Sequence, residues 1–235
     1  MRRPMKDLNY TGYYVQTYEN CFIERIEAGF SGLCFVYFKD GSVSFFETAC
    51  SVYNRQYGIP VSEKHRCIFI GTWERGLYCY DAYTGERRWR SPMGRNRNMY
   101  VPPHSDYIIT TRAGKGLFRL DIATGLVHDS LRSTNVSFAY DIADTVALVE
   151  RLGRDYCLVD LEQFRIIKHY PCKVVELPGN DNFILMDAWI EHDDTLSEDK
   201  LFIEYWHRNP GEENSELRHR QIDSFPSLKA LRNGD

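Results

Sequence analysis

A histidine followed by two carboxylates, His192-Asp193-Asp194, is the densest group of titratable side chains in the sequence. Paired carboxylates can bind a hard cation, and an imidazole beside them can accept or donate a proton. The same three residues, preceded by Glu191, are also typical of an acidic loop in water. We favour the solvated loop and predict neither a catalytic nor a metal site there.

A second candidate is Ala113-Gly114-Lys115-Gly116, which has the composition of a phosphate-binding loop. A phosphate cradle needs a further upstream glycine and a following helix, whereas this segment lies between two predicted strands. We interpret it as a hairpin turn. The sequence also lacks the G-x-S-x-G and H-E-x-x-H motifs. We therefore predict no catalytic residue, no cofactor and no metal, and expect a protein that is not an enzyme.

The seven cysteines are scattered, and most fall within apolar segments, where a free thiol behaves as a small hydrophobic side chain. No C-x-x-C pair is present, and the nearest candidate metal pair, His65 with Cys67, stands alone. No apolar stretch is long enough to cross a bilayer, and no apolar region follows the basic start of the chain. We expect a cytoplasmic protein in a reducing compartment that contacts no membrane.

Charge is distributed unevenly along the chain. Over Glu191–Glu216, nine acidic residues stand against Lys200 and Arg208, although the whole chain carries a net charge of only −4. Arginines gather instead between Arg87 and Arg97. Such a split surface favours an electrostatically steered contact with another protein. No extended basic face is apparent, so nucleic-acid binding is not expected.

The candidate loops described above, around residues 113–116 and 191–194, would have to be held in place by short strands. A strand pair is predicted over residues 67–81, and a tight turn follows it. Asp81 can accept hydrogen bonds from backbone N–H groups in this turn, and Gly85 supplies the positive φ that closes it. Trp89 then offers a large flat surface for packing. One such hairpin cannot bury its own apolar face, so the unit must repeat.

The unit does repeat, since Asp121–Gly125 restates Asp81–Gly85 forty residues later. The predicted turn-opening acidic residues are Glu47, Asp81, Asp121 and Asp160. The predicted innermost strands are Phe22–Glu27, Ile59–Glu63, Asn98–Val101, Val136–Ala139 and Lys173–Leu177, and Val52–Tyr57 is predicted as the last strand of the first unit. Five four-stranded units at this period predict an all-β fold, a β-propeller of about five blades that need not close fully.

The turn at Asp81 resembles the quinoprotein (PQQ-type) propeller repeat. The matching residues are Asp81, Thr84, Gly85 and Trp89 in one copy and Asp121, Thr124 and Gly125 in the next. Cys79 stands at the usual alanine, and Asp129 replaces the second tryptophan. Dehydrogenases of that family have about eight blades and a cofactor on the axis, whereas this chain has room for about five. The resemblance implies a degenerate propeller relative without the quinone cofactor.

In a propeller, the loops that join the second and third strands of every blade emerge on one face. The predicted partner-binding residues on these loops are Trp73, Glu74, Arg75, Arg112, Lys115, Arg151, Arg154, Glu191, His192, Asp193 and Asp194. Tryptophan and arginine dominate the energetics of protein interfaces. Packing of Trp73 over the adjacent blade is the alternative for that residue.

Three functions remain open. We favour a protein-binding propeller that inhibits a cognate partner, such as a bacterial immunity protein that blocks a toxin with a basic active-site cleft. It would be a monomer apart from its complex, and the step from binder to inhibitor is an analogy. A five-bladed lectin would repeat its ligand residues in every blade, which these aromatic residues do not. A glycosidase or quinoprotein-type enzyme would need converging carboxylates, for which Asp187 and Glu204 are the candidates.

The expected domain organisation follows from these units. Residues 1–20 form an N-terminal segment and a candidate ring-closing strand, residues 21–224 form one propeller domain, and residues 225–235 form a C-terminal tail. We expect this tail to be ordered only where it docks on the propeller.

Overall fold

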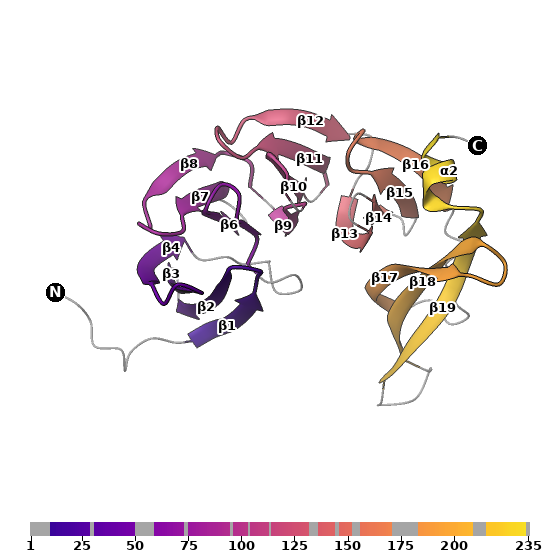
Figure 1. Cartoon of the computed structure of the whole chain (residues 1–235), viewed down its shortest axis with the longest axis horizontal. Helices are drawn as coiled ribbons and strands as arrows, with labels where there is room; N and C mark the ends of the chain where they lie inside the picture. The colour runs from indigo at the N-terminus through magenta and orange to yellow at the C-terminus, as the bar shows by residue number, and fades with distance from the viewer. Residues whose placement is uncertain are drawn as a thin grey trace. The chain divides into compact units, whose positions relative to one another are not determined.

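The computed structural model describes residues 10–28, 31–49, 59–72, 75–94, 96–102, 104–112, 114–131, 136–143, 146–151, 156–170, 183–208 and 215–233. The chain divides into two compact units, Met1–Ser133 (unit 1) and Thr134–Asp235 (unit 2). Its described strands form five antiparallel sheets, four of them with four strands and one with three (Figure 1). The predicted all-β fold built from about five repeated sheets is confirmed.

The first sheet has the strand order β1-β2-β3-β4. Its strands are β1 (Tyr10–Thr17), β2 (Cys21–Ala28), β3 (Ser31–Phe38) and β4 (Val43–Ala49). Burial alternates along β2, where Cys21, Ile23 and Arg25 are buried while Phe22 and Glu24 are not. Because successive side chains of a strand point to opposite faces, one face of this sheet lies in a core and the other does not.

The strand order corrects one sequence prediction. Phe22–Glu27 was expected to be the innermost strand of the first unit, but β1 precedes it, so β2 is the second strand of its sheet. The segment predicted as a candidate ring-closing strand thus supplies β1 of the first sheet. Each predicted strand of this unit that the structure describes is therefore one position later in its sheet than expected. Glu47, which was predicted to open a turn, accordingly lies within β4. Val52–Tyr57 and Lys173–Leu177 lie outside the described residues.

The second and third sheets complete unit 1. The second sheet contains β5 (Val61–Ser62), β6 (Cys67–Gly71), β7 (Leu77–Asp81) and β8 (Arg87–Ser91), and the third contains β9 (Asn96–Tyr100), β10 (Tyr107–Arg112), β11 (Gly116–Asp121) and β12 (Val127–Leu131). All five residues of β6 are buried, because both faces of the second sheet are covered. A strand of this kind reads as a continuous apolar run, which is what CIFIG is.

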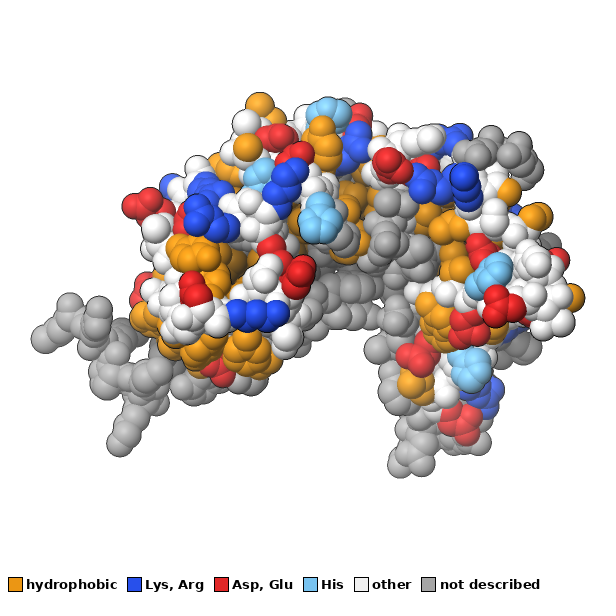
Figure 2. All heavy atoms as spheres, in the orientation of Figure 1, with side chains coloured by type: hydrophobic (Ala, Val, Ile, Leu, Met, Phe, Trp, Pro, Cys, Tyr) orange, Lys and Arg blue, Asp and Glu red, His pale blue; other side chains and the backbone are white. Residues whose placement is uncertain are grey.

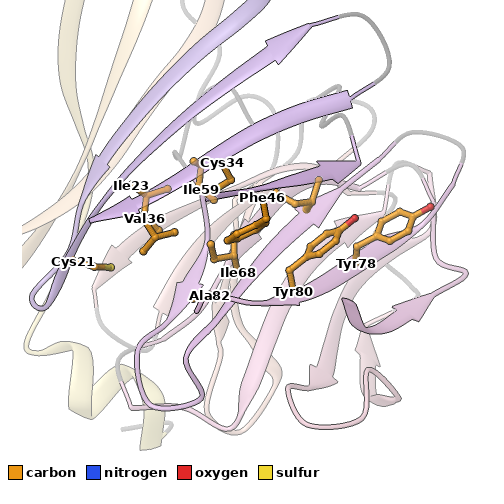
Figure 3. Packing of buried hydrophobic residues seen from close by; sticks show 11 residues of the cluster. Cys21, Ile23, Cys34, Val36, Phe46, Ile59, Ile68, Tyr78, Tyr80 and Ala82 are labelled. Carbon is orange, nitrogen blue, oxygen red and sulfur yellow. The ribbon is translucent and has the colours of Figure 1, made fainter. Parts of the chain in front are cut away.

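Two apolar clusters hold the sheets of unit 1 together. The first joins Ile23, Val36 and Phe46 of the first sheet to Ile68 and Tyr80 of the second, and Figure 3 shows its side chains interleaved between the two sheets. The second cluster joins the opposite face of the second sheet to the third sheet. The second sheet therefore buries both of its faces against its two neighbours, as packed propeller blades do.

Unit 2 contains the fourth and fifth sheets. The fourth has β13 (Val136–Ala143), β14 (Val146–Arg151), β15 (Tyr156–Asp160) and β16 (Arg165–Tyr170), and the fifth has β17 (Phe183–Asp193), β18 (Glu198–Arg208) and β19 (Ser215–Phe225). The strands of the fifth sheet are the longest described, at eleven residues each. Asp223 of β19 accepts hydrogen bonds from Lys168 Nζ (2.7 Å) and from the hydroxyl of Tyr170 (2.5 Å), both on β16. These contacts join the two sheets of unit 2.

The C-terminal tail is docked on unit 2. After β19 it forms the short helix α2 (Leu228–Asn233). Arg232 of α2 pairs with Asp160 at the end of β15 through Nε–Oδ2 (2.9 Å) and Nη2–Oδ1 (3.0 Å) contacts. At the other end of the helix, Asp199 Oδ2 accepts a hydrogen bond from the backbone N–H of Leu228 (2.6 Å). No helix among the described residues has the length and apolar character needed to cross a membrane.

Candidate partner-binding site

The repeat residues that resemble the quinoprotein motif build the turns between third and fourth strands. Asp81 Oδ1 accepts hydrogen bonds from the N–H groups of Tyr83 (2.8 Å) and Thr84 (2.9 Å), and Gly85 adopts a φ of 72°. Thr84 Oγ1 accepts a further hydrogen bond from the N–H of Glu86 (3.2 Å). The side chains that recur in sequence are thus those that satisfy the backbone of a tight turn.

The third sheet repeats this turn closely. Asp121 Oδ1 accepts hydrogen bonds from the N–H (2.7 Å) and hydroxyl (2.7 Å) of Thr124, and Gly125 has a φ of 72°. In the fourth sheet, where the Thr-Gly pair is missing, Asp160 still accepts two backbone hydrogen bonds, and Phe164 takes the left-handed conformation with a φ of 54°. In the first sheet, Asp40 accepts the corresponding bond from Ser42.

Trp89 packs against a neighbouring repeat, as the sequence predicts. Its Nε1 donates a hydrogen bond to the carbonyl of Ile122 (2.7 Å), and a Cβ added to Gly125 would come within 2.5 Å of its ring. Phe46 of the first sheet has the same relation to Gly85 of the second, where an added Cβ would lie 2.3 Å from Phe46. An aromatic ring from one sheet thus covers the bare glycine of the next turn at both junctions of unit 1.

The described candidates of unit 1, Arg75, Arg112 and Lys115, lie at two separate hairpin turns. Arg75 is exposed in the β6–β7 turn, where its carbonyl accepts a hydrogen bond from Arg90 Nε (2.7 Å). Lys115 is exposed in the β10–β11 turn, and Arg112 at the end of β10 is half-buried. The turn is closed by a hydrogen bond from the N–H of Lys115 to the carbonyl of Arg112 (2.9 Å). The segment around Lys115 is therefore a hairpin turn and not a phosphate loop.

Some predicted site residues lie outside the described structure. Trp73, Glu74 and Arg154 fall outside the described residues, and Arg151 is described only through its backbone at the end of β14. The described residues therefore do not show the eleven predicted partner-binding residues forming one surface. That these residues bind a partner together stays a prediction. Asp187, a candidate carboxylate of the enzyme alternative, is opposite Glu204 in the register of β17 and β18.

Glu191, His192, Asp193 and Asp194 do come together at the tip of the β17–β18 hairpin. The register sets Glu191 opposite Lys200 and His192 opposite Asp199. In Figure 2, acidic side chains gather at the surface over these two strands. We name the segment Glu191–Lys200 the acidic hairpin.

Most charged groups of the acidic hairpin are bound within it. His192 Nδ1 lies 2.8 Å from Asp199 Oδ1, and Lys200 Nζ contacts Asp193 Oδ2. Asp193 Oδ1 also accepts hydrogen bonds from the N–H groups of Thr195 (2.9 Å) and Leu196 (3.2 Å). The hydrogen bond with Asp199 raises the pKa of His192, and the ion pair with Lys200 lowers the pKa of Asp193. These contacts hold the tip in one conformation.

A second surface was not anticipated from the sequence. The side of the first sheet opposite the core carries a group of apolar residues, among them Phe22, Phe35, Tyr37, Val43 and Phe45, which we name the aromatic face. Val43 and Phe45 are 57% and 59% exposed. The alternation of apolar residues on both faces of β3 could have revealed this surface, because a strand with one solvated face usually carries polar residues there.

The described cysteines agree with their predicted role. Cys21, Cys34, Cys67, Cys79 and Cys157 are free and buried. Burial raises the pKa of Cys21 to about 11 and that of Cys34 to about 12, so both remain neutral thiols at physiological pH. Among the described residues, no group of three or more His, Cys, Asp or Glu side chains is placed to hold a metal ion.

Five sheets of this topology define a β-propeller, and similar solved structures are propellers too. The chain is similar to BamB from Moraxella catarrhalis, a PQQ-like propeller, with a TM-score of 0.53 and 14% identity over 87% of this chain and 58% of that one. It is also similar to the β-propeller domain of Cps50 (Swd1) from Myceliophteria thermophila, with a TM-score of 0.52 and 10% identity over 95% of this chain and 77% of that one.

A third similar structure is Sqt1 from Saccharomyces cerevisiae, with a TM-score of 0.54 and 10% identity over 87% of this chain and 60% of that one. The chain thus spans less than two thirds of BamB and of Sqt1. No family model matches the sequence, and no curated protein matches it. Likeness at these identities shows the propeller fold, while the specifically PQQ-type character of the repeats stays a prediction.

Proposed function

We propose that this chain is a protein-binding propeller without a catalytic role, and that the acidic hairpin enters a basic cleft of the partner. The observation that carries the proposal is the arrangement of the hairpin tip. Leu196 is 59% exposed there, and the side chain of Asp194 is 101% exposed. An apolar side chain beside carboxylates suits a partner surface that combines an apolar pocket with lysine or arginine.

The bound state of the hairpin would be largely formed before the partner arrives. The contacts of Asp193 with Lys200 and of His192 with Asp199 fix the two strands next to the turn. Asp199 is in turn hydrogen-bonded to the N–H of Leu228 at the start of α2. Because side chains that are already ordered lose less conformational entropy on binding, this arrangement favours affinity.

Within this class we propose an inhibitor, such as a cytoplasmic immunity protein that blocks a toxin. A held acidic projection supports this function because it can occupy a cleft that binds anionic substrates. Long-range attraction between the acidic hairpin and a basic cleft would also speed association, which an inhibitor of a harmful partner needs. The partner's cleft and its activity are parts of the proposal that the test below addresses.

The test uses a double variant of the full chain, Asp194→Lys with Leu196→Ser. A partner isolated with the wild-type protein should bind the variant about a hundredfold more weakly at low salt, and its inhibition should be lost. The matched control is Glu86→Lys with Leu126→Ser, since Glu86 is exposed and Leu126 is 69% exposed on other turns. Calorimetry measures the affinity, and the partner's own assay measures inhibition.

Three results would contradict the proposal. Equal binding by the wild-type protein and the hairpin variant would remove the acidic hairpin from the interface. Equal loss in the control variant would show a nonspecific effect of charge. Glycan binding without any protein partner would favour the lectin alternative.

A further inference from the structure

The aromatic face is a continuous apolar surface and not a scatter of exposed residues. The ring centroids of Phe35 and Phe45 are 4.7 Å apart, and those of Phe22 and Tyr37 are 5.5 Å apart. Phe35 and Tyr37 are 6.5 Å apart and nearly parallel, which connects the two pairs. The pairs cross β2, β3 and β4, so the surface covers three neighbouring strands. In Figure 2, hydrophobic side chains reach the surface along this side of the first sheet.

The equivalent surface of the second sheet is an interface. Its residues at the same places in the second and third strands are Ile68 and Ile70 of β6 and Tyr78 and Tyr80 of β7. All four belong to the cluster shared with the first sheet, and none is more than 7% exposed. The third sheet uses Ile108, Phe118 and Leu120 against the second sheet in the same way.

The aromatic face therefore has the composition of a buried sheet interface but the exposure of a surface. Phe22 is 37% exposed and Phe45 is 59% exposed, compared with 7% for Tyr78 and for Tyr80. Contiguous apolar surface of this kind is rare on soluble proteins except where another molecule binds. Its flat shape and its aromatic side chains suit the apolar face of another sheet, as in the two internal junctions of unit 1.

The charges on this face are of one sign. Strand alternation places Glu24 and Glu47 among the aromatic residues, and the hydroxyl of Tyr37 donates a hydrogen bond to Glu24 Oε2 (3.0 Å). No lysine or arginine of the described strand residues falls on this face. A partner with basic residues around an apolar centre would compensate these carboxylates when water is removed.

We propose that the aromatic face is a docking surface for a second protein that presents an apolar sheet face bordered by lysine and arginine. A second copy of this chain is a poorer occupant. A symmetric contact would bring Glu24 and Glu47 of both copies into one desolvated interface, where like charges repel. The aromatic face is distinct from the acidic hairpin, so this surface stands whether or not the hairpin binds.

The first experiment places a photoreactive phenylalanine analogue at position 45 of the full chain in its native cells. The control is the same analogue at position 126, since Leu126 is 69% exposed on a turn of the third sheet, away from the aromatic face. We expect a cross-link at position 45 to one protein, at a peptide that contains apolar residues and lysine or arginine. Mass spectrometry identifies the peptide. The hairpin variant Asp194→Lys with Leu196→Ser should retain this cross-link, which separates the two proposals.

The second experiment uses the purified partner. Val43→Ser with Phe45→Ser should weaken binding about tenfold to a hundredfold, because aromatic residues at the centre of an interface carry much of the affinity. Glu47→Lys should also weaken binding, and changing the cross-linked lysine or arginine of the partner to glutamate should restore it. The free double variant should melt at the wild-type temperature.

Other results would overturn the proposal. A cross-link between two copies, or within one chain, would give the surface a different occupant. So would a lower melting temperature of the free double variant, since the face would then be covered in the isolated protein. A cross-link no stronger than that from position 126, an unchanged affinity, or a failure of the charge exchange would remove the docking surface altogether.

Discussion

A glycine under an aromatic ring is the residue-scale feature that joins the sheets of unit 1. Gly85 lies under Phe46, and Gly125 lies under Trp89. Both glycines have positive φ, so each position is constrained twice, by the backbone conformation and by the ring above it. The recurring turn glycine of the second and third sheets is therefore also the contact point for the preceding sheet.

The substitution Gly125→Ala should separate these two constraints. Its Cβ would strain the left-handed backbone, which costs about 1 kcal/mol, and would displace Trp89, which costs about 1–3 kcal/mol more. Gly114→Ala is the matched control, because Gly114 has a φ of 70° with nothing within 4 Å of an added Cβ. Urea unfolding measures both variants. Equal losses of stability would show that the ring contact contributes nothing.

The ionisation of Asp81 makes the stability of the turn in the second sheet depend on pH. Partial burial alone would raise its pKa, but the Arg88 guanidinium, 2.6 Å away, and the N–H groups of Thr84 and Tyr83 outweigh this effect. The pKa of Asp81 is held at about 2, compared with 3.8 for a free aspartate. Because the folded-state pKa is the lower one, the stabilisation is complete above pH 4 and disappears as the pH falls toward 2.

Asp81→Asn should accordingly lower the free energy of unfolding by about 2 kcal/mol at pH 7, following about 1.4 kcal/mol per pKa unit. The difference between variant and wild type should shrink when both are measured near pH 2. Urea titrations at several pH values provide the measurement. A difference that stays constant over this range would assign the loss to the turn hydrogen bonds and not to the charge.

At the scale of elements, α2 fastens the end of the chain to unit 2. Asp160 is fully buried, and Arg232 of α2 approaches both of its oxygens. Arg232 also contacts Glu162, and the salt bridges with Asp160 and Glu162 raise the pKa of Arg232. The tail that the sequence predicts to be ordered only by docking is thus a structural part of unit 2.

Arg232→Ala should destabilise unit 2 by about 3 kcal/mol, because it leaves a buried carboxylate without its counter-ion. Lys229→Ala is the control, since Lys229 is exposed on the same helix. Chemical unfolding followed by tryptophan fluorescence is suited to this comparison, because Trp189 lies in unit 2. If both variants unfolded at the wild-type urea concentration, α2 would have no role in stability.

The acidic hairpin makes a prediction of its own about protonation. The hydrogen bond with Asp199, assisted by the charges of Asp194 and Asp193, raises the pKa of His192 above 6.5. An NMR titration of the imidazole should show this higher pKa, and Asp199→Asn should bring it back toward 6.5. An unchanged titration in the variant would mean that the pair does not persist in solution.

At the scale of the whole molecule, all the described residues of the two apolar clusters of unit 1 belong to unit 1 itself. A fragment of residues 1–133 should therefore fold without unit 2 and unfold in one cooperative transition. Circular dichroism during urea titration measures this. A gradual, non-cooperative loss of signal would show that unit 1 depends on the rest of the chain.

The sequence predicts the propeller well because its strongest repeat forms turns, and the hydrogen bonds of a turn join residues that are close in the sequence. Asp81, Thr84 and Gly85 specify a turn through contacts within five residues, and Asp121, Thr124 and Gly125 repeat it. The first unit was misplaced by one strand, because Tyr10–Thr17 carries no turn motif and a strand's position in its sheet depends on distant pairing. Of the candidate site, the acidic hairpin follows from charge alone, whereas the aromatic face needs the register of three strands.

The junctions of unit 1 have a consequence for how such a chain can grow. The stretch from Ile59 to Gly94 contains both residues that such a contact between sheets needs. Gly85 packs under the ring of the preceding sheet, and Trp89 supplies the ring for the next one. If this stretch were duplicated in tandem, Trp89 of one copy would pack over Gly85 of the next, so no new contact surface would be needed. Lengthening or shortening the array by whole repeats is then a simpler change than altering any one of them.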